Sequence, residues 1–323
     1  MSPAATIAET LKGRGHILLL NHASPDGDSL GSTLALARTF WARGQRATVG
    51  SSDGVPEMYR FLPGCDRVVS EIADGERFDA VVFMECSAPE RAGPLVARAA
   101  GVPLWVNIDH HVSNTGYGDL VLLDVEAAAV AEVVYPIVAV LHPHLDPETA
   151  VCLLTALLTD TGSFRYANVT PKSFQMAAEL VKVGASPALV YGEVYENRSP
   201  ASVRLLGMAL SRMVVCDDGR VVWTAVTQQM LRESGATMED SEGIVGAIRA
   251  IRGIQVALLF KEEPDSIRVS LRGVGNVRAN VIAEAFGGGG HPAAAGFTAT
   301  GGLDHVVGQT LTAVRRELGA TAR

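Results

Sequence analysis

The sequence predicts an α/β protein in two parts, the first of which is a parallel sheet with helices on both faces. Short apolar runs rich in Val, Leu and Ile alternate with segments of helical periodicity through the first half of the chain. A second series of strand and helix patterns begins after residue 213. The chain has 323 residues, which is long enough for two hydrophobic cores.

The elements expected in the first half follow the strand, helix, strand order of right-handed βαβ units. Gly44 ends the first long helix, and Pro143 breaks the chain between two later ones. The expected strands are 16–20, 46–51, 79–86 and 104–108, and the expected helices are 32–43, 127–141, 148–158 and 171–190.

The second half is expected to form a smaller α/β domain behind a helical linker. Pro200 is a helix-start signal within the helical pattern of 194–213. We therefore expect a first domain at 1–190, a linker at 191–213 and a second domain at 214–323. The elements expected in the second domain are strands at 220–226, 255–261 and 266–272 and helices at 243–251 and 280–285.

The net charge of −8 arises in the first part of the chain. Residues 1–190 contain 13 Lys and Arg against 21 Asp and Glu, whereas residues 191–323 contain 14 of each. An excess of acid favours a divalent-cation site. The totals show no broad basic groove for a long nucleic acid, so a short or mononucleotide substrate is expected.

The remaining composition indicates a cytoplasmic globular protein. No apolar run reaches the roughly 18 residues of a membrane span, and the first residues lack the pattern of a signal peptide. We therefore expect no membrane partner. The four cysteines are scattered without a CxxC pair, which is typical of reduced thiols: Cys65, Cys86, Cys152 and Cys216.

Acids and histidines gather at the ends of several predicted strands. Asp109, His110 and His111 directly follow the apolar run 103–108. Because the carboxyl ends of neighbouring parallel strands meet at one edge of a sheet, these groups are expected to share a crevice. The other members follow the first strand, end the strand of 79–86 or close a helix: His22, Asp26, Asp28, Glu85 and Asp160.

Such a set of oxygen and nitrogen ligands predicts a site for two divalent cations. Two ions can clamp a phosphoryl group and lower the pKa of a bridging water. Ligands without thiolate suit Mn²⁺, Mg²⁺ or Co²⁺ better than a structural zinc. For one acid the structural alternative stays open, because Asp28 would also fit as a cap of the helix expected from Ser32.

A run of four glycines before His291 predicts an anion-binding segment in the second domain. Glycines permit positive φ and close backbone approach, so their N–H groups can cradle a phosphate. Arg272 is expected on the exposed side of a neighbouring strand, where its guanidinium could reach the same phosphate. The predicted substrate-binding residues are Arg272, Gly288, Gly289, Gly290 and His291.

These motifs resemble those of the DHH phosphoesterase family, in particular its nanoRNase and pAp-phosphatase branch. The resemblance rests on His22-x-x-x-Asp26-x-Asp28, the Asp109-His110-His111 triplet, the segment 159–164 (TDTGSF) and GGGGHPAAAG at 287–296. It covers nearly the whole chain. It implies a DHH domain, a linker and a DHH-associated domain that holds the substrate.

The resemblance also implies a role for each motif residue. His22 and Asp26 would bind one manganese ion, and Asp28, His110 and Asp160 the other. The remaining implied roles are a bridging ligand at Glu85, catalytic groups at Asp109 and His111, and substrate contacts at Arg272, His291 and the glycines before it. The implied substrates are short RNA or DNA oligonucleotides, cleaved to 5′-mononucleotides, and 3′-phosphoadenosine 5′-phosphate (pAp), converted to AMP.

Glu85 departs from the family pattern, which usually has Asp at this position. One extra methylene moves the carboxylate by about 1.5 Å, so we expect a retained ligand with altered geometry. Two alternatives stay open: a cyclic or linear dinucleotide phosphodiesterase, and a catalytically weak nucleotide-binding sensor. A homodimer also stays open.

Overall fold

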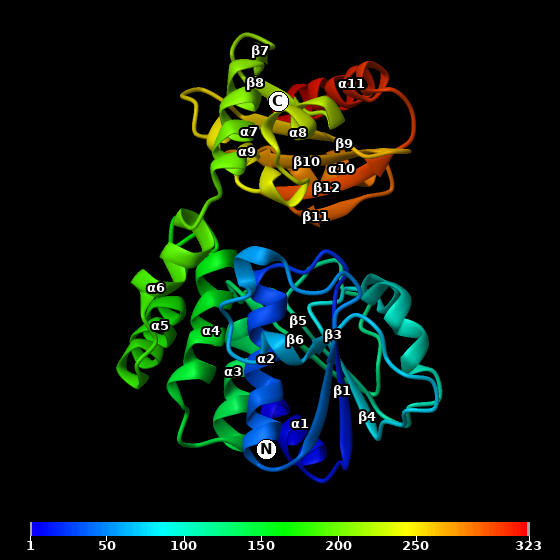
Figure 1. Cartoon of the computed structure of the whole chain (residues 1–323), viewed down its shortest axis with the longest axis vertical. Coiled ribbons are helices and arrows are strands. Elements are labelled where there is room, and N and C mark those ends of the chain that lie inside the picture. Colours follow the sequence, from blue (N-terminus) through cyan, green and yellow to red (C-terminus); the bar gives the residue numbers. More distant parts are fainter. Residues whose placement is uncertain (1, 322–323) are drawn as a thin grey trace. The chain divides into compact units, whose positions relative to one another are not determined.

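The computed structural model describes residues 2–321 and divides the chain into two units, 1–197 and 198–323. Figure 1 shows both units, each with its own sheet and its own helices. The predicted fold class is confirmed, because each unit combines a six-stranded sheet with packed helices. The predicted domain and linker boundaries stay a prediction.

The first unit begins with a helix and then builds a sheet whose strands alternate with helical segments. Its elements are α1 (Pro3–Lys12), β1 (His16–Asn21), α2 (Gly27–Ala42), β2 (Arg46–Gly50), η1 (Glu57–Tyr59), η2 (Cys65–Arg67), β3 (Val68–Val69), β4 (Ala80–Met84), η3 (Pro89–Ala99), β5 (Trp105–Asp109), β6 (Leu120–Leu123), α3 (Val130–Leu141), α4 (Pro147–Asp160), α5 (Pro171–Val183), α6 (Pro187–Tyr191) and η4 (Gly192–Glu196).

The sheet of this unit has the order β3-β2-β1-β4-β5-β6, and every pairing in it is parallel. One face packs against α1, α2 and α3, and α4 and α5 extend the same hydrophobic core from the far side of these helices. The other face is covered by η3 together with apolar residues of the loops. Both faces of the central strands are therefore buried, which explains why β1 and β4 read as continuous apolar runs.

The second unit carries a mixed sheet in the order β11-β12-β10-β9-β8-β7. Only β8 and β9 pair in parallel, and the other pairings are antiparallel. Its elements are α7 (Pro200–Ser211), β7 (Val214–Cys216), β8 (Val221–Val226), α8 (Gln228–Ser234), η5 (Glu239–Ser241), α9 (Ile244–Arg249), β9 (Val256–Glu262), β10 (Ile267–Gly273), α10 (Ala279–Glu284), β11 (Gly289–His291), β12 (Ala294–Ala299) and α11 (Leu303–Thr321).

Two cores lie on opposite faces of this second sheet. One is formed with α10 and α11, and the other with α7, α8 and α9. Leu205 and Ala209 of α7 belong to the second of these cores. The helix that begins at Pro200, as predicted, is therefore packed into the second unit.

The helix expected at 32–43 begins earlier than predicted. α2 starts at Gly27, because Asp26 is its N-cap and accepts a hydrogen bond from the Ser29 backbone N–H at 2.9 Å. The sequence did not reveal this start, because the first turn of α2 buries polar and small residues and shows no apolar stripe. The alternative cap assigned to Asp28 is therefore wrong for α2.

The four cysteines are free thiols, and Cys86 and Cys152 are buried. Burial raises the pKa of the Cys152 thiol to about 12, which keeps it protonated and unreactive at neutral pH. Within residues 2–321, no helix combines the length and the apolar content that a membrane crossing requires.

Candidate metal centre and active site

Three neighbouring strands of the first sheet deliver the predicted groups to one edge. β1, β4 and β5 lie side by side and run parallel. His22 directly follows β1, Glu85 directly follows β4, and β5 ends at Asp109. The carboxyl ends of adjacent parallel strands are where α/β proteins place their sites.

The six predicted ligands form two groups within this edge. In each group one ligand atom per residue lies within 4.8 Å of the others. The first group is His22, Asp26 and Glu85, and the second is Asp28, His110 and Asp160. The structure thus brings together the sets that the family resemblance implied.

Glu85 connects the two groups. Its Oε2 lies 3.9 Å from Nε2 of His22, and its Oε1 lies 3.7 Å from Nε2 of His110. The residue has a positive φ of 57°, which is costly for a side chain of this length. The backbone N–H of Glu85 donates to Ile108 O at 2.9 Å, so the neighbouring strand stabilises this conformation.

Asp28 is held by the start of a second helix. Its Oδ2 accepts a hydrogen bond from the Val130 N–H at 2.6 Å, and its Oδ1 accepts from the Ala131 N–H at 3.1 Å. The Ser32 hydroxyl donates to the same Oδ1. Asp28 lies in α2 but caps α3, whose N-terminal N–H groups have no partner inside their own helix.

Two glycines allow α2 to approach α4 closely. A Cβ at Gly31 would collide with the backbone oxygen of Cys152, and a Cβ at Gly27 would collide with the Thr159 side chain. This close contact brings together Asp28 at the start of α2 and Asp160 at the end of α4, although the chain separates them by more than a hundred residues.

The pKa values of the cluster indicate a demand for positive charge. Burial, together with repulsion from Asp26 and other carboxylates, raises the pKa of Glu85 and of Asp28 well above their usual range. The same causes raise the pKa of Asp160 to about 6. Burial lowers the pKa of His110, but the surrounding carboxylates outweigh it and raise this pKa to about 11.

The donor set fits divalent cations. Oε2 of Glu85 is buried and has no hydrogen-bond partner within residues 2–321. A buried carboxylate oxygen without a donor is costly, and a cation removes that cost. The two groups supply oxygen and imidazole nitrogen only, which are the ligands of manganese and magnesium sites.

Asp109 belongs to neither of the two ligand groups. Its Oδ1 accepts hydrogen bonds from the His110 N–H, from the His111 N–H and from Nδ1 of His111, the last at 2.8 Å. Its Oδ2 accepts from the Asn114 amide at 2.6 Å. These bonds outweigh the effect of burial and hold the Asp109 pKa below its usual range, so the carboxylate fixes the His111 ring.

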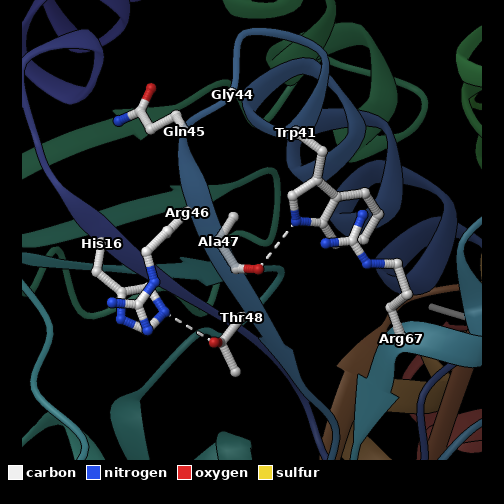
Figure 2. A pocket seen from close by; sticks show the side chains of 8 residues that line it. All are labelled: His16, Trp41, Gly44, Gln45, Arg46, Ala47, Thr48 and Arg67. Atoms are coloured by element: carbon white, nitrogen blue, oxygen red, sulfur yellow. Dashed lines mark hydrogen bonds between the residues drawn. The ribbon is translucent and has the colours of Figure 1, made fainter.

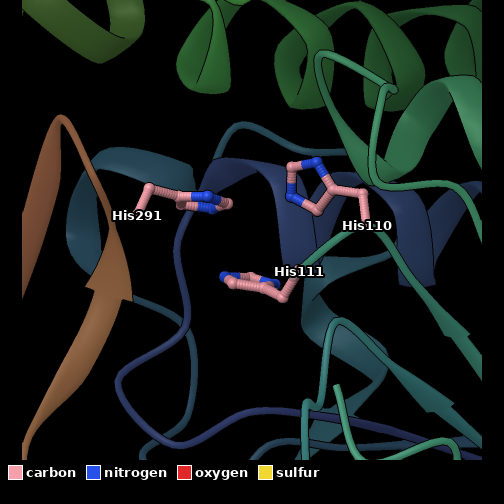
Figure 3. A group of neighbouring side chains, drawn as sticks. All are labelled: His110, His111 and His291. Carbon is pink, nitrogen blue, oxygen red and sulfur yellow. The ribbon is translucent and has the colours of Figure 1, made fainter. Parts of the chain in front are cut away.

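Figure 3 shows His110 and His111 as neighbours at the end of β5. Their ring centroids are 5.0 Å apart and the rings are nearly perpendicular. His110 belongs to the second ligand group, whereas His111 binds Asp109 through Nδ1 and leaves Nε2 on the other side of its ring. The third ring in Figure 3, His291, comes from β11 of the second unit.

The sequence did not reveal the polar network behind His111. The Asn114 amide also donates to Asn107 Oδ1 at 3.1 Å. Tyr117 donates its hydroxyl to Cys86 O at 3.0 Å, next to Glu85. A buried Asn within β5 was the one available signal, because Asn107 is an unusual residue in an otherwise apolar strand.

The glycine run of the second unit forms a strand as well as a turn. Gly289, Gly290 and His291 make up β11, which pairs with β12. A Cβ at Gly288 would collide with Gly296 O, so a glycine is required there for packing. The Gly288 N–H donates to Ala283 O at 3.0 Å, which corrects the prediction that this N–H is available to a phosphate.

Arg272 and His291 share one face of this sheet. Arg272 pairs with Ala294 across β10 and β12, and His291 pairs with the same Ala294 across β11 and β12. Arg272 is thus two strands away from β11 and not on an adjacent strand, which corrects the sequence analysis. Residues opposite each other in antiparallel pairs point to the same face, so only a methyl group separates the two basic side chains.

Comparison with known proteins identifies the family. Residues 16–157 match the DHH family, N-terminal domain, and residues 219–319 match the DHHA1 domain. The chain is 35% identical over 317 residues to a bifunctional oligoribonuclease and PAP phosphatase NrnA of Thermus thermophilus, which covers 97% of this chain and 93% of the relative. This chain belongs to the DHH family.

A second curated relative and a solved structure are also similar to this chain. The chain is 28% identical to the Bacillus subtilis protein of the same name, over 87% of this chain and 88% of the relative. A solved exopolyphosphatase-related protein from Bacteroides fragilis has a TM-score of 0.90 at 24% identity, covering 99% and 98% of the two chains. This last similarity concerns the fold alone. The family resemblance seen in the motifs is thereby confirmed.

Proposed function

We propose that this DHH-family chain is a manganese-dependent phosphoesterase that cleaves short oligoribonucleotides to 5′-mononucleotides and pAp to AMP. The observation that carries the proposal is the pair of ligand groups joined by Glu85. The substrate class is supported by the relatives, whose names state both activities.

In this proposal the two groups would hold two divalent ions, and Glu85 would serve as a ligand of both. Bound there, the ions supply a water of lowered pKa and neutralise charge on the phosphoryl group. Manganese is preferred because the ligands combine hard oxygens with imidazole. The proposed ligands are His22 and Asp26 for one ion and Asp28, His110 and Asp160 for the other.

His111 is proposed to act on the scissile phosphate or its leaving group. Asp109 occupies Nδ1 of the ring at 2.8 Å, so Nε2 is the atom that can meet the substrate. Asp109 is a positioning residue, since its hydrogen bonds go to the His111 ring and to the backbone N–H groups of His110 and His111. Asn114 in turn holds Asp109 from the other side.

Binding of the rest of the substrate is proposed for the second unit. Arg272 and His291 lie on one sheet face with Ala294 between them. The neighbouring positions on that face are small, because Ser270 pairs with Gly296, which pairs with Gly289. Two basic side chains over a floor of small residues suit a phosphate with its sugar. Gly289 and Gly290 are kept in this proposal, whereas Gly288 has a packing role.

One assay panel tests the proposal. The purified chain is offered pAp, RNA of two to five nucleotides, longer RNA and DNA, and cyclic dinucleotides, with manganese, magnesium or a chelator. We expect turnover of pAp and of the shortest RNA, fastest with manganese and absent with chelator. Equal rates on short and long RNA would contradict the substrate class.

The same panel decides between the alternatives. Turnover of cyclic dinucleotides without turnover of pAp would indicate a dinucleotide phosphodiesterase. Tight nucleotide binding without any turnover would indicate a sensor, for which Glu85 in place of the usual Asp is the structural motive. Either result would overturn the proposed activity.

A further inference from the structure

A hollow lies at the opposite end of the first sheet, where β1 and β2 begin (Figure 2). Its volume is about 360 Å³, within the range of about 300–1,000 Å³ that is typical of small-molecule sites. β1 has six residues, so the hollow and the ligand groups are separated by roughly 15–20 Å of strand. The hollow is therefore distinct from the proposed metal centre.

One wall of the hollow is an open strand edge. β3 pairs with Val49 and Gly50 of β2, so within residues 2–321 no strand pairs with the start of β2 on that side. Ala47 O accepts a hydrogen bond from the Trp41 indole N–H at 2.9 Å, which shows that the peptide groups of Ala47 point away from β1. Because both polar groups of one strand residue point to the same side in a parallel pair, the Ala47 N–H is a donor toward the hollow.

A second wall offers a flat cationic plane. The Arg67 guanidinium lies over the Trp41 ring, 3.5 Å from its centroid (Figure 2). The indole is fixed by its bond to Ala47, so the guanidinium is fixed too. Its outer face is free of the indole, and a guanidinium plane is a surface on which nucleic-acid bases stack.

A second guanidinium faces the same space. Arg46 and Arg67 both line the hollow and both are exposed, and neither forms an ion pair in the described part of the chain. His16 donates or accepts through Nε2 to the Thr48 hydroxyl at 2.9 Å, and Glu76 lies 3.7 Å from the same nitrogen. Both guanidinium groups are therefore available to hydrogen-bond an anion in the hollow.

We propose that this hollow binds a 5′-mononucleotide, with the base on the Arg67 plane and the phosphate on Arg46 and the Ala47 N–H. The choice of a mononucleotide rests on the proposed function, because 5′-mononucleotides are its products. A planar ring and a charged phosphate are the two features that these walls match. α2 carries the proposed ligand Asp28 in its first turn and Trp41, which lines the hollow, in its last turn, so one helix connects the two sites.

Fluorescence of Trp41 tests the proposal in the full-length chain. Replacing Trp105 and Trp223 by Phe leaves Trp41 as the one reporter. We expect saturable quenching by AMP, with or without manganese, at least tenfold weaker binding of inorganic phosphate, and no binding of adenosine. Arg46→Ala and Arg67→Ala should each weaken AMP binding at least tenfold, whereas the exposed Arg60→Ala should not.

Two results would overturn the proposal: no saturable quenching by AMP, or equal affinity of the Arg67→Ala and Arg60→Ala variants. Phosphate binding as tight as AMP would overturn the nucleotide assignment. If the variant with Phe at positions 105 and 223 does not fold, calorimetric titration with AMP is carried out on the chain that keeps all its tryptophans. It compares the AMP affinities of the same arginine variants. Oligonucleotide turnover should be unchanged in Arg67→Ala, so failure of this site and failure of the proposed activity are separate observations.

Discussion

The carboxyl edge of the first sheet and the part of the second sheet that carries Arg272 and His291 present polar side chains in opposite ways. At the edge, three strand ends and two helix ends converge, and six side chains from distant parts of the sequence come within 4.8 Å of their group partners. On the face, Arg272 and His291 stand two strands apart, about 10 Å between backbones. At the edge the charged groups lie close together, whereas on the face the two basic side chains stand apart.

The difference predicts a division of labour between the two regions. A convergent cluster with raised carboxylate pKa values creates a strong demand for cations, which suits chemistry. Separate basic side chains on a flat face can hold a substrate equally in its ground and transition states, which suits binding. Changes at the edge should therefore reduce kcat and metal content, and changes on the face should raise KM.

Asp160→Ala should have the largest effect. Removing this ligand leaves Asp28 and His110 alone in the second group, so we expect a loss of about a thousandfold in kcat, or about 4 kcal/mol. Asp146→Ala is the matched control, because Asp146 caps the other end of the same helix. It should cost about 1 kcal/mol of stability and keep turnover. Kinetics and metal analysis test the assignment. It would be contradicted if Asp160→Ala kept both ions and the kcat of the parent.

Glu85→Gln should be the next most severe change. It removes a negative charge between the two proposed cations, so we expect a loss of about a hundredfold in kcat together with weaker metal binding. Glu85→Asp keeps the charge and should stay within about tenfold of the parent, in either direction. Equal kcat of the Gln variant and the parent at equal metal occupancy would show that Glu85 binds no ion.

Most of the convergent edge could be predicted because parallel topology forces it. Neighbouring parallel strands have their carboxyl ends at one edge of the sheet. The residues that directly follow β1, β4 and β5 therefore lie at that edge, and they include His22, Glu85 and His110. The pairing of Asp28 with α3 could not be predicted, since it depends on how two helices distant in sequence pack. The chain offers no local signal for that contact.

The second sheet was harder to predict because its key segments have weak strand signals. β12 reads AAGFTA and β11 reads GGH, and Ala and Gly are depleted in strands. The glycines were therefore interpreted as an anion cradle, although Gly288 is needed for contact with β12. The insertion of β12 between β10 and β11 explains the error in the position of Arg272.

Asn114→Ala should have an intermediate effect on the edge. It leaves Asp109 Oδ2 without its amide donor, at a cost of about 1–3 kcal/mol for a buried polar group. We expect kcat to fall about tenfold, because His111 loses its fixed orientation. Metal content and KM should change little. Asn197→Ala, which removes an exposed amide bonded to Glu193, is the control. Loss of metal in Asn114→Ala would contradict the positioning role.

Arg272→Ala tests the other side of the comparison. We expect KM for pAp to rise about tenfold with kcat and metal content nearly unchanged, since the lost contact is used equally before and during the reaction. Arg315→Ala removes a guanidinium on α11 that pairs with Asp217 and should leave KM unchanged. A fall in kcat with constant KM would show that Arg272 acts in the chemical step. It would contradict the proposal that the second sheet contributes to binding alone.

Gly31→Ala should have the smallest effect on turnover. The new methyl group meets Cys152 O and pushes α2 away from α4, which we expect to cost about 1–3 kcal/mol of stability and to weaken metal binding a few-fold. Gly207→Ala is the control, because no atom lies near a Cβ at that helical position; it should stabilise by about 0.5–1 kcal/mol. Thermal unfolding with and without manganese distinguishes the two variants.

The hydrogen bonds between Asp28 and α3 make one helix responsible for the position of a residue on another helix. Val130 and Ala131 hold both oxygens of this carboxylate through their N–H groups, so the position of Asp28 depends on the position of α3. Among residues 2–321, α3 contributes no side chain to either ligand group. A substitution that shifts this helix is therefore expected to weaken metal binding, although it changes no ligand.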